Sequence, residues 1–121
     1  LRGALLYLDL DHFKHINDTE GHERGDQVLI EIGGLLQDKV RADDAVVRLG
    51  GDEFVVLLGD ADAATLEKLV ERLRQDAGKA PCRFSLGAAL REGDESLAAT
   101  MARADAAMYS ARSVARRTTT P

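Results

Sequence analysis

The chain has 121 residues, of which 31% are charged and 45% hydrophobic, so it is long enough to form one domain with a buried core. Its net charge of −5 argues against a nucleic-acid-binding surface, which would need a basic face, but a bound divalent cation would still allow a phosphate ligand. The single cysteine, Cys82, excludes an internal disulfide and fits a reducing compartment. No apolar run reaches membrane-spanning length. We therefore expect a cytoplasmic fragment that contacts neither nucleic acid nor membrane.

The first half of the chain predicts a strand, two helices and a hairpin. An apolar run at residues 4–11 ends in acidic side chains, which is typical of a buried central strand. Residues 12–26 are polar, with one short helical turn near Phe13 and Ile16. Apolar residues then recur at helical spacing from Val28 to Val40. Two apolar runs around a glycine-rich turn predict a β-hairpin at residues 45–58.

The second half predicts a helix, a strand and a last helix. Apolar spacing indicates a helix from about Asp62 to Asp76, and residues 82–90 are typical of a strand. Ser96 is a suitable N-cap for the final helix. An antiparallel hairpin within this alternation favours a mixed sheet with helices packed on its faces, which is an α+β fold.

The hairpin turn, "GGDE" at residues 50–53, carries two adjacent acids that a turn alone does not require. If the hairpin lies beside the first strand, Asp52 and Glu53 come close to Asp9 at the end of that strand. Carboxylates without histidine suit Mg²⁺ or Mn²⁺, which also share phosphate oxygens of a nucleotide. The two glycines would let a ligand approach the backbone. The alternative is an ordinary turn with solvated acids, which is the commoner case for such a turn alone.

The polar segment after the first strand adds three groups suited to a nucleotide. Lys14 can hold phosphate as a point charge. Asn17 and Asp26 offer an amide and a carboxylate, which match the donor and acceptor edge of guanine. A carboxylate facing that edge would reject adenine, which lacks the matching donors. Together with the acids, these residues favour a guanine nucleotide bound with a metal.

Five segments occur in order along almost the whole chain: "LDLDHFKHINDTEGHERGDQVL", "RADD", "RLGGDEFVVLL", "FSLGAA" and "RADAAMYSAR". Together they resemble the GGDEF family, the diguanylate cyclases that make cyclic di-GMP from two GTP. The resemblance implies a palm-like, ferredoxin-related sheet of five strands with helices on its faces, as in nucleotidyl cyclases. It implies a cyclase domain at residues 1–117, without the N-terminal helix that usually begins it, followed by a flexible tail at 118–121.

The resemblance also implies roles for individual residues. Two Mg²⁺ or Mn²⁺ ions per active site would be bound by Asp9, Asp52 and the main-chain carbonyl of Leu10. Glu53 would act as a further metal ligand or in deprotonating the attacking hydroxyl. The GTP-binding residues would be the main chain at His12 and Phe13, together with Lys14, Asn17, Asp26, Gly50, Gly51, Arg112 and Arg116. Arg112 stands where the family usually has a lysine.

The family resemblance further implies regulation by product. Arg41 and Asp44 in "RADD" match an Arg-x-x-Asp motif of members that cyclic di-GMP inhibits, and Arg72 matches a second arginine of that site. The plainer reading of Arg41 is a cation at a helix end. Catalysis would need a homodimer of such domains, driven by an upstream sensory domain in the parent chain, including membrane-bound sensors. The alternative function is a non-catalytic module that binds GTP or cyclic di-GMP and signals.

Overall fold

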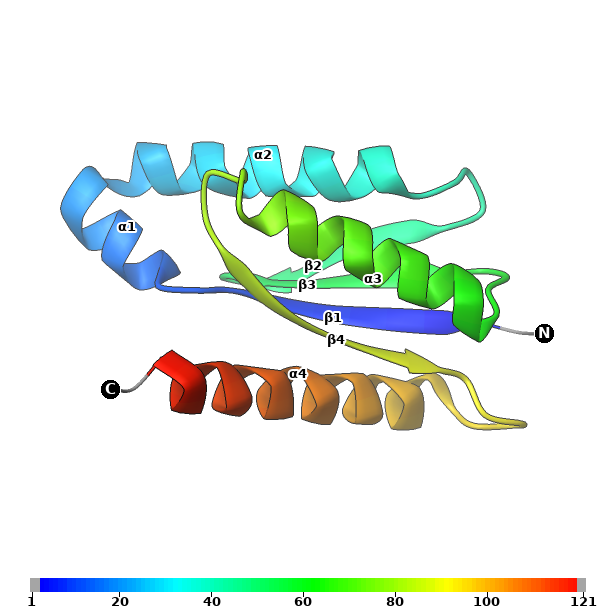
Figure 1. The fold of residues 1–121 in the computed structure, drawn as a ribbon. Coiled ribbons are helices and arrows are strands. Elements are labelled where there is room, and N and C mark those ends of the chain that lie inside the picture. The colour runs from blue at the N-terminus through cyan, green and yellow to red at the C-terminus, as the bar shows by residue number, and fades with distance from the viewer. Residues whose placement is uncertain (1–2, 120–121) are drawn as a thin grey trace.

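The computed structural model describes the backbone of residues 3–119 and the side chains of residues 3–111. Eight elements follow one another in the predicted order of strand, two helices, hairpin, helix, strand and helix (Figure 1). They are β1 (Ala4–Leu10), α1 (Phe13–Glu20), α2 (His22–Lys39), β2 (Ala45–Gly50), β3 (Glu53–Leu58), α3 (Ala63–Ala77), β4 (Phe84–Leu90) and α4 (Leu97–Thr119). The α+β prediction is confirmed.

The sheet differs from the prediction in two details. Its four described strands lie in the order β2-β3-β1-β4, so five strands are not seen in the described part of the chain. Each neighbouring pair is antiparallel, so the predicted mixed sheet is wrong. The reason is that β1 and β2 are joined through helices and run parallel, but β3 lies between them. In the same way, β1 lies between β3 and β4, which is the split arrangement of ferredoxin-like folds.

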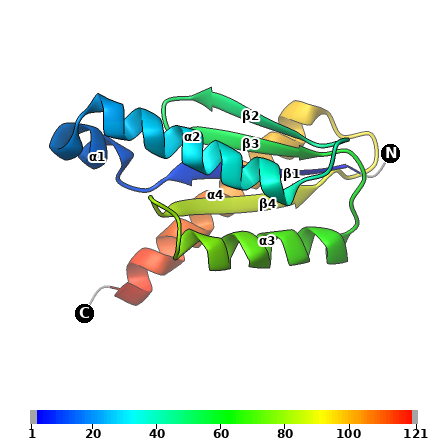
Figure 2. The ribbon, with the colours of Figure 1, turned by 90° about the horizontal axis from the view of Figure 1, so that it is seen from above.

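The helices form a layer on each face of the sheet. Helices α2 and α3 cover one face and α4 covers the other (Figures 1 and 2). In β1 the even-numbered residues Leu6 and Leu8 belong to the larger core under α2 and α3. The odd-numbered Leu5 belongs to a second cluster with Ala104 of α4, and Tyr7 packs against that cluster. Strand β1 is therefore buried on both faces, as its apolar run predicted.

The start of α4 is fastened to the end of β4. The hydroxyl of Ser96 accepts a hydrogen bond from the Ala99 N–H at 3.1 Å, which confirms the predicted N-cap. Arg103 binds both carboxylate oxygens of Glu95, with Nε–Oε2 at 2.7 Å and Nη2–Oε1 at 2.6 Å. Its Nη2 also donates to the carbonyl of Leu90. This bidentate pairing holds the pKa of Glu95 at about 2, below its usual value of 4.5.

None of the helices among the described residues is long and apolar enough to cross a bilayer. Two predictions fall beyond what the structure describes. The side chains of Arg112 and Arg116 lie outside the described residues, and so does the end of the tail expected at 118–121. Their predicted roles stay predictions.

Candidate functional site

The predicted acids meet at one end of the sheet. Asp9 of β1 lies directly opposite Glu53 of β3 in the strand register. The main-chain N–H of Leu10 donates to the carbonyl of Asp52 at 3.0 Å, which ties the hairpin turn to the end of β1. The turn itself needs glycine, because Gly51 has a φ of 38°, and its carbonyl accepts a hydrogen bond from Arg48 Nε at 3.1 Å. The turn is thus held from both sides next to Asp9.

One residue that the sequence did not single out contacts this acidic turn. The hydroxyl of Tyr7, on β1, donates a hydrogen bond to Glu53 Oε2. This bond, burial, and the negative charges of Glu53, Asp105 and Asp9 raise the pKa of Tyr7 far above its usual value of 10. The phenol therefore remains a protonated donor beside the carboxylates.

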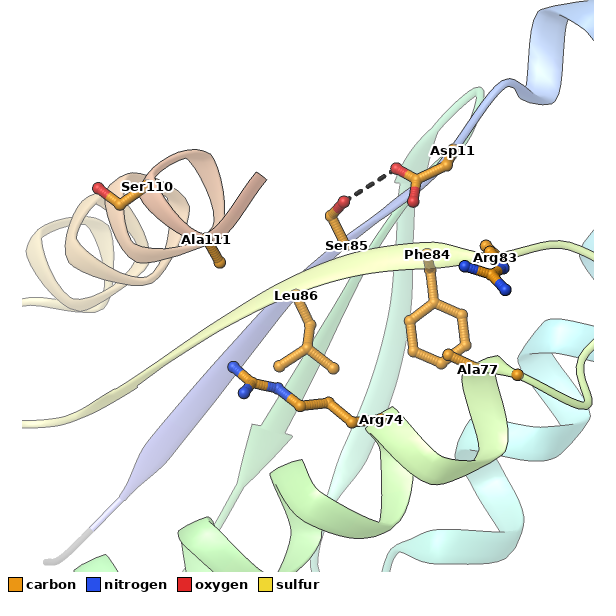
Figure 3. A pocket seen from close by; sticks show the side chains of 10 residues that line it. Asp11, Arg74, Ala77, Arg83, Phe84, Ser85, Leu86, Ser110 and Ala111 are labelled. Atoms are coloured by element: carbon orange, nitrogen blue, oxygen red, sulfur yellow. Dashed lines mark hydrogen bonds between the residues drawn. The ribbon is translucent and has the colours of Figure 1, made fainter. Parts of the chain in front are cut away.

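Asp11, which directly follows β1, turns toward β4 (Figure 3). Its Oδ1 accepts a hydrogen bond from Ser85 Oγ at 2.9 Å (Figure 3). Its carbonyl lies 3.3 Å from the sulfur of the buried Cys82. Burial, followed by the charges of Asp11 and Asp52, raises the pKa of this thiol. Cys82 is therefore a poor nucleophile, because the reactive form of cysteine is the thiolate.

A hollow of about 790 Å³ opens beside β4, between the end of α3 and the middle of α4 (Figure 3). Asp11, Ser85, Arg74 and Arg83 contribute its polar groups. The acids of the hairpin turn do not line it, and neither do the predicted guanine-binding residues. No local sequence pattern predicted this hollow, because its lining residues come from four separate segments of the chain.

The strand-to-helix turn after β1 has an unusual backbone. His12, the N-cap of α1, adopts a left-handed conformation with φ 58° and ψ 28°, which is uncommon for a residue other than glycine. Strained residues of this kind cluster at ligand-binding sites. The Phe13 side chain is buried in the core, so only its main chain could serve a ligand. Lys14 is exposed. The N-terminus of α1 and this exposed ammonium are both groups that suit a phosphate.

The predicted guanine-binding pair lies where α1 meets α2. A Cβ atom on Gly25 would sit 1.8 Å from Asn17 Oδ1, so only glycine at that position leaves room for this amide. Asp26 follows Gly25 directly and is exposed, whereas Asn17 is half-buried. The sequence missed Gly25, although a glycine within a helical segment beside a candidate ligand residue is a usable signal.

The donor set suits a hard divalent cation. Among the described residues, no three His, Cys, Asp or Glu side chains are grouped so that they could hold a metal ion by themselves. Magnesium commonly uses only one or two protein carboxylates and takes its other ligands from water and substrate phosphates. The opposed Asp9 and Glu53 and the adjoining Asp52 fit that pattern. A metal here would take one or two of these carboxylates at a time, together with the main chain at Leu10.

A second, basic hollow of about 280 Å³ brings together all three residues predicted for product binding. Arg41, Asp44 and Arg72 line it, together with Lys39 and Lys68. The two members of the Arg-x-x-Asp motif differ in exposure, because the Arg41 side chain is 68% exposed and that of Asp44 is 2% exposed.

The carboxylate of Asp44 is already bound to main-chain groups. Its Oδ1 accepts from the Gly59 N–H and its Oδ2 from the Arg41 N–H, both at 2.9 Å. Arg41 Nη2 donates to the Asp60 carbonyl at 2.7 Å. Asp44 therefore fixes the loop that presents Arg41, and the cations supply the surface that a ligand would meet.

The sequence model of the family described as "Diguanylate cyclase, GGDEF domain" matches residues 1–118. The chain belongs to this family. Among characterised relatives, the bifunctional diguanylate cyclase/cyclic di-GMP phosphodiesterase MucR of Pseudomonas aeruginosa is 47% identical over 92% of this chain and 18% of MucR. The diguanylate cyclase DgcM of Escherichia coli is 41% identical over 90% of this chain and 28% of DgcM. The chain thus spans less than a third of either relative.

Solved GGDEF domains share the fold. The GGDEF domain of DgcB from Caulobacter crescentus, in complex with c-di-GMP, superposes with a TM-score of 0.85 at 30% identity. The match covers 93% of this chain and 72% of that one. The diguanylate cyclase SiaD from Pseudomonas aeruginosa, in complex with its activator SiaC, also gives 0.85, at 33% identity over 93% of this chain and 47% of SiaD. The predicted family membership is confirmed.

Proposed function

We propose that this GGDEF domain is the catalytic part of a diguanylate cyclase that condenses two GTP into cyclic di-GMP and two pyrophosphates. The observation that carries the proposal is the strand register, which sets Asp9 opposite Glu53 at the end of the sheet where β1 leads into α1. Metal-compatible acids, helix amides and a guanine-compatible pair therefore occur around one end of the fold. Its relatives' names support the same reaction.

Each half of the reaction is a phosphoryl transfer that needs positioning and charge neutralisation. The 3′-hydroxyl oxygen of one GTP attacks the α-phosphorus of the other, and the bond to pyrophosphate breaks. Glu53 accepts the proton of that hydroxyl, while Lys14 and the amides near His12 hold the terminal phosphates. Asp9 and Asp52 would hold a divalent cation, which would supply positive charge near the phosphate oxygens.

Substrate choice is assigned to the α1–α2 contact. Asn17 and Asp26 would hydrogen-bond the guanine edge, with Gly25 leaving room for the amide. Adenine lacks the donors that a carboxylate accepts, so ATP would leave Asp26 without a partner. Because one domain holds one GTP, two domains must face each other, and the product would form only in a homodimer. An upstream sensory domain in the parent chain would set such a dimer, with the cyclase domains themselves in the cytoplasm.

Product feedback is the second part of the proposal. The basic hollow around Arg41 and Arg72 offers guanidinium groups suited to phosphates and to the Hoogsteen edge of guanine. Cyclic di-GMP bound there would restrain the domains from closing on each other. The complex of the DgcB GGDEF domain with c-di-GMP supports binding of this ligand by a domain of the same fold.

The test is a turnover assay on the full-length protein with GTP and Mg²⁺, in which cyclic di-GMP is identified by mass. We expect product from the wild type and none from Glu53→Gln, which keeps the size of the side chain but removes its charge. GTP binding without any product from the wild type would instead indicate a non-catalytic signalling module. Full activity of Glu53→Gln would overturn the role of Glu53.

A further inference from the structure

Asp9, Asp52 and Glu53 form an acidic corner at one end of the sheet, and Tyr7 contacts this corner without a role in the proposed reaction. It belongs to β1, two residues before Asp9, and the alternation of a strand puts both side chains on the face covered by α4. Tyr7 pairs across the sheet with Val55, so Glu53 is its diagonal neighbour on that face. A tyrosine is long enough to span such a diagonal, and its hydroxyl donates to Glu53 Oε2.

The ring of Tyr7 is fixed while its hydroxyl reaches the site. The ring packs against the cluster formed by Leu5, Val55, Ala89 and Ala104 between the sheet and α4. Few rotamers are open to a ring held in this way, so the hydroxyl has a defined position. Glu53, by contrast, begins β3 next to a glycine-containing turn and is half-buried. The hydrogen bond therefore restrains the Glu53 carboxylate, because it joins this side chain to a ring that is packed against α4.

The charges around Glu53 make such support necessary. Asp9 lies directly opposite, and like charges in opposed positions of a sheet repel each other. Asp105 of α4 adds a further negative charge close to Tyr7. Without a neutral donor on this face, Glu53 would turn away from the other carboxylates into solvent. The Tyr7 hydroxyl bonds to Oε2 and leaves Oε1 for the site.

We infer that Tyr7 is a positioning residue of the cyclase, which holds Glu53 through its hydroxyl so that the carboxylate is pre-oriented for metal and substrate. This inference rests on the proposed function, because it gives Tyr7 a role through Glu53. Groups that orient metal-binding carboxylates commonly change metal affinity or activity by about 10- to 100-fold when they are lost.

The test compares Tyr7→Phe with Tyr109→Phe in the full-length protein. Both substitutions remove one hydroxyl, but Tyr109 is 68% exposed on α4 and makes no described hydrogen bond to the acids. For Tyr7→Phe we expect kcat to fall about 10-fold or more, with KM for GTP within about twofold. We expect no change for Tyr109→Phe.

A second measurement separates positioning from folding. Binding of Mn²⁺ in the presence of a non-hydrolysable GTP analogue, followed by electron paramagnetic resonance, should be about 10-fold weaker in Tyr7→Phe. The same substitution should cause no further loss of Mn²⁺ affinity in a Glu53→Gln background, because the hydroxyl then has no carboxylate to hold. A merely structural role would lower the unfolding temperature and leave Mn²⁺ affinity unchanged, and that result would overturn the inference.

The outcomes also distinguish this inference from the proposed function. If Glu53→Gln is inactive while Tyr7→Phe keeps wild-type kcat and Mn²⁺ affinity, the positioning role is wrong and the cyclase proposal stands. If Glu53→Gln keeps full activity, both the catalytic role of Glu53 and the role of Tyr7 are wrong.

Discussion

Two regions of this domain use aspartate in opposite ways. In the acidic corner, Asp52 is half-buried in the hairpin turn and bonds to Leu10 only through its carbonyl. In the basic hollow, the side chain of Asp44 is 2% exposed and accepts hydrogen bonds from two main-chain N–H groups. Within the described part of the chain no hydrogen bond to the Asp52 carboxylate is found, which fits its proposed role at the active site, whereas the Asp44 carboxylate holds a loop. Residue type alone does not separate these roles, whereas the partners of each carboxylate do.

The same substitution in both regions gives the sharpest test of that contrast, and its largest effect is expected at Asp52. Asp52→Asn should lower turnover by about 10²-fold or more, since it removes the charge that we propose binds a metal. The unfolding temperature should stay the same or rise, because one charge leaves a group of acids. Turnover by mass-identified product and a thermal melt on the same sample check both parts. Wild-type turnover would contradict the assignment of Asp52.

Asp44→Asn should show the opposite pattern. The side-chain NH₂ of asparagine would face one of the two main-chain N–H groups that now donate to the carboxylate. That N–H would lose its acceptor, so we expect the free energy of unfolding to fall by about 2 kcal/mol. Urea unfolding followed by circular dichroism measures this change. An unfolding midpoint equal to that of the wild type would show that Asp44 does not brace the loop.

Arg41→Ala should weaken product binding with a smaller energetic effect. Its side chain is 68% exposed, so its loss costs little stability, but we expect an affinity for cyclic di-GMP about 10-fold lower. Titration calorimetry gives the affinity. Arg74→Ala is the matched control, because Arg74 lies on the same helix as Arg72 but lines the other hollow. If Arg41→Ala and Arg74→Ala bind cyclic di-GMP with equal affinity, the product does not bind in the basic hollow.

The smallest effect concerns a third carboxylate engaged in structure, Glu95. Its pKa is lowered from 4.5 to about 2 by Arg103, so its stabilising effect is fully present above about pH 5 and is lost as the pH falls toward 2. The difference in unfolding temperature between wild type and Glu95→Gln should therefore shrink over that range. A difference that is independent of pH would show that the ion pair does not stabilise the fold.

Local sequence patterns predicted the elements and their order, because apolar spacing and caps such as Ser96 act over a few residues. The strand neighbours were harder to predict, since the insertion of β3 between β1 and β2 depends on contacts between distant segments. For the same reason, the proximity of Asp9, Asp52 and Glu53 could be predicted only as a hypothesis. The contact of Tyr7 with Glu53 was not predicted at all. Two further features depend on packing and cannot be inferred from residue type. They are the contact between the Asn17 side chain and Gly25 and the burial of the Asp44 side chain.

The position of β1 has a consequence for how the domain is made. Of the four described strands, β1 is synthesised before the others, and its partners β3 and β4 begin only at Glu53 and Phe84. Pairings of such long sequence separation form slowly, because a large loop must close first. During synthesis, this apolar strand therefore remains with both edges unpaired until β3 and β4 have been made, which is the condition that promotes aggregation. The acids Asp9 and Glu53 come together only when β1 has paired with β3. Cyclase activity would therefore show that this long-range pairing has formed.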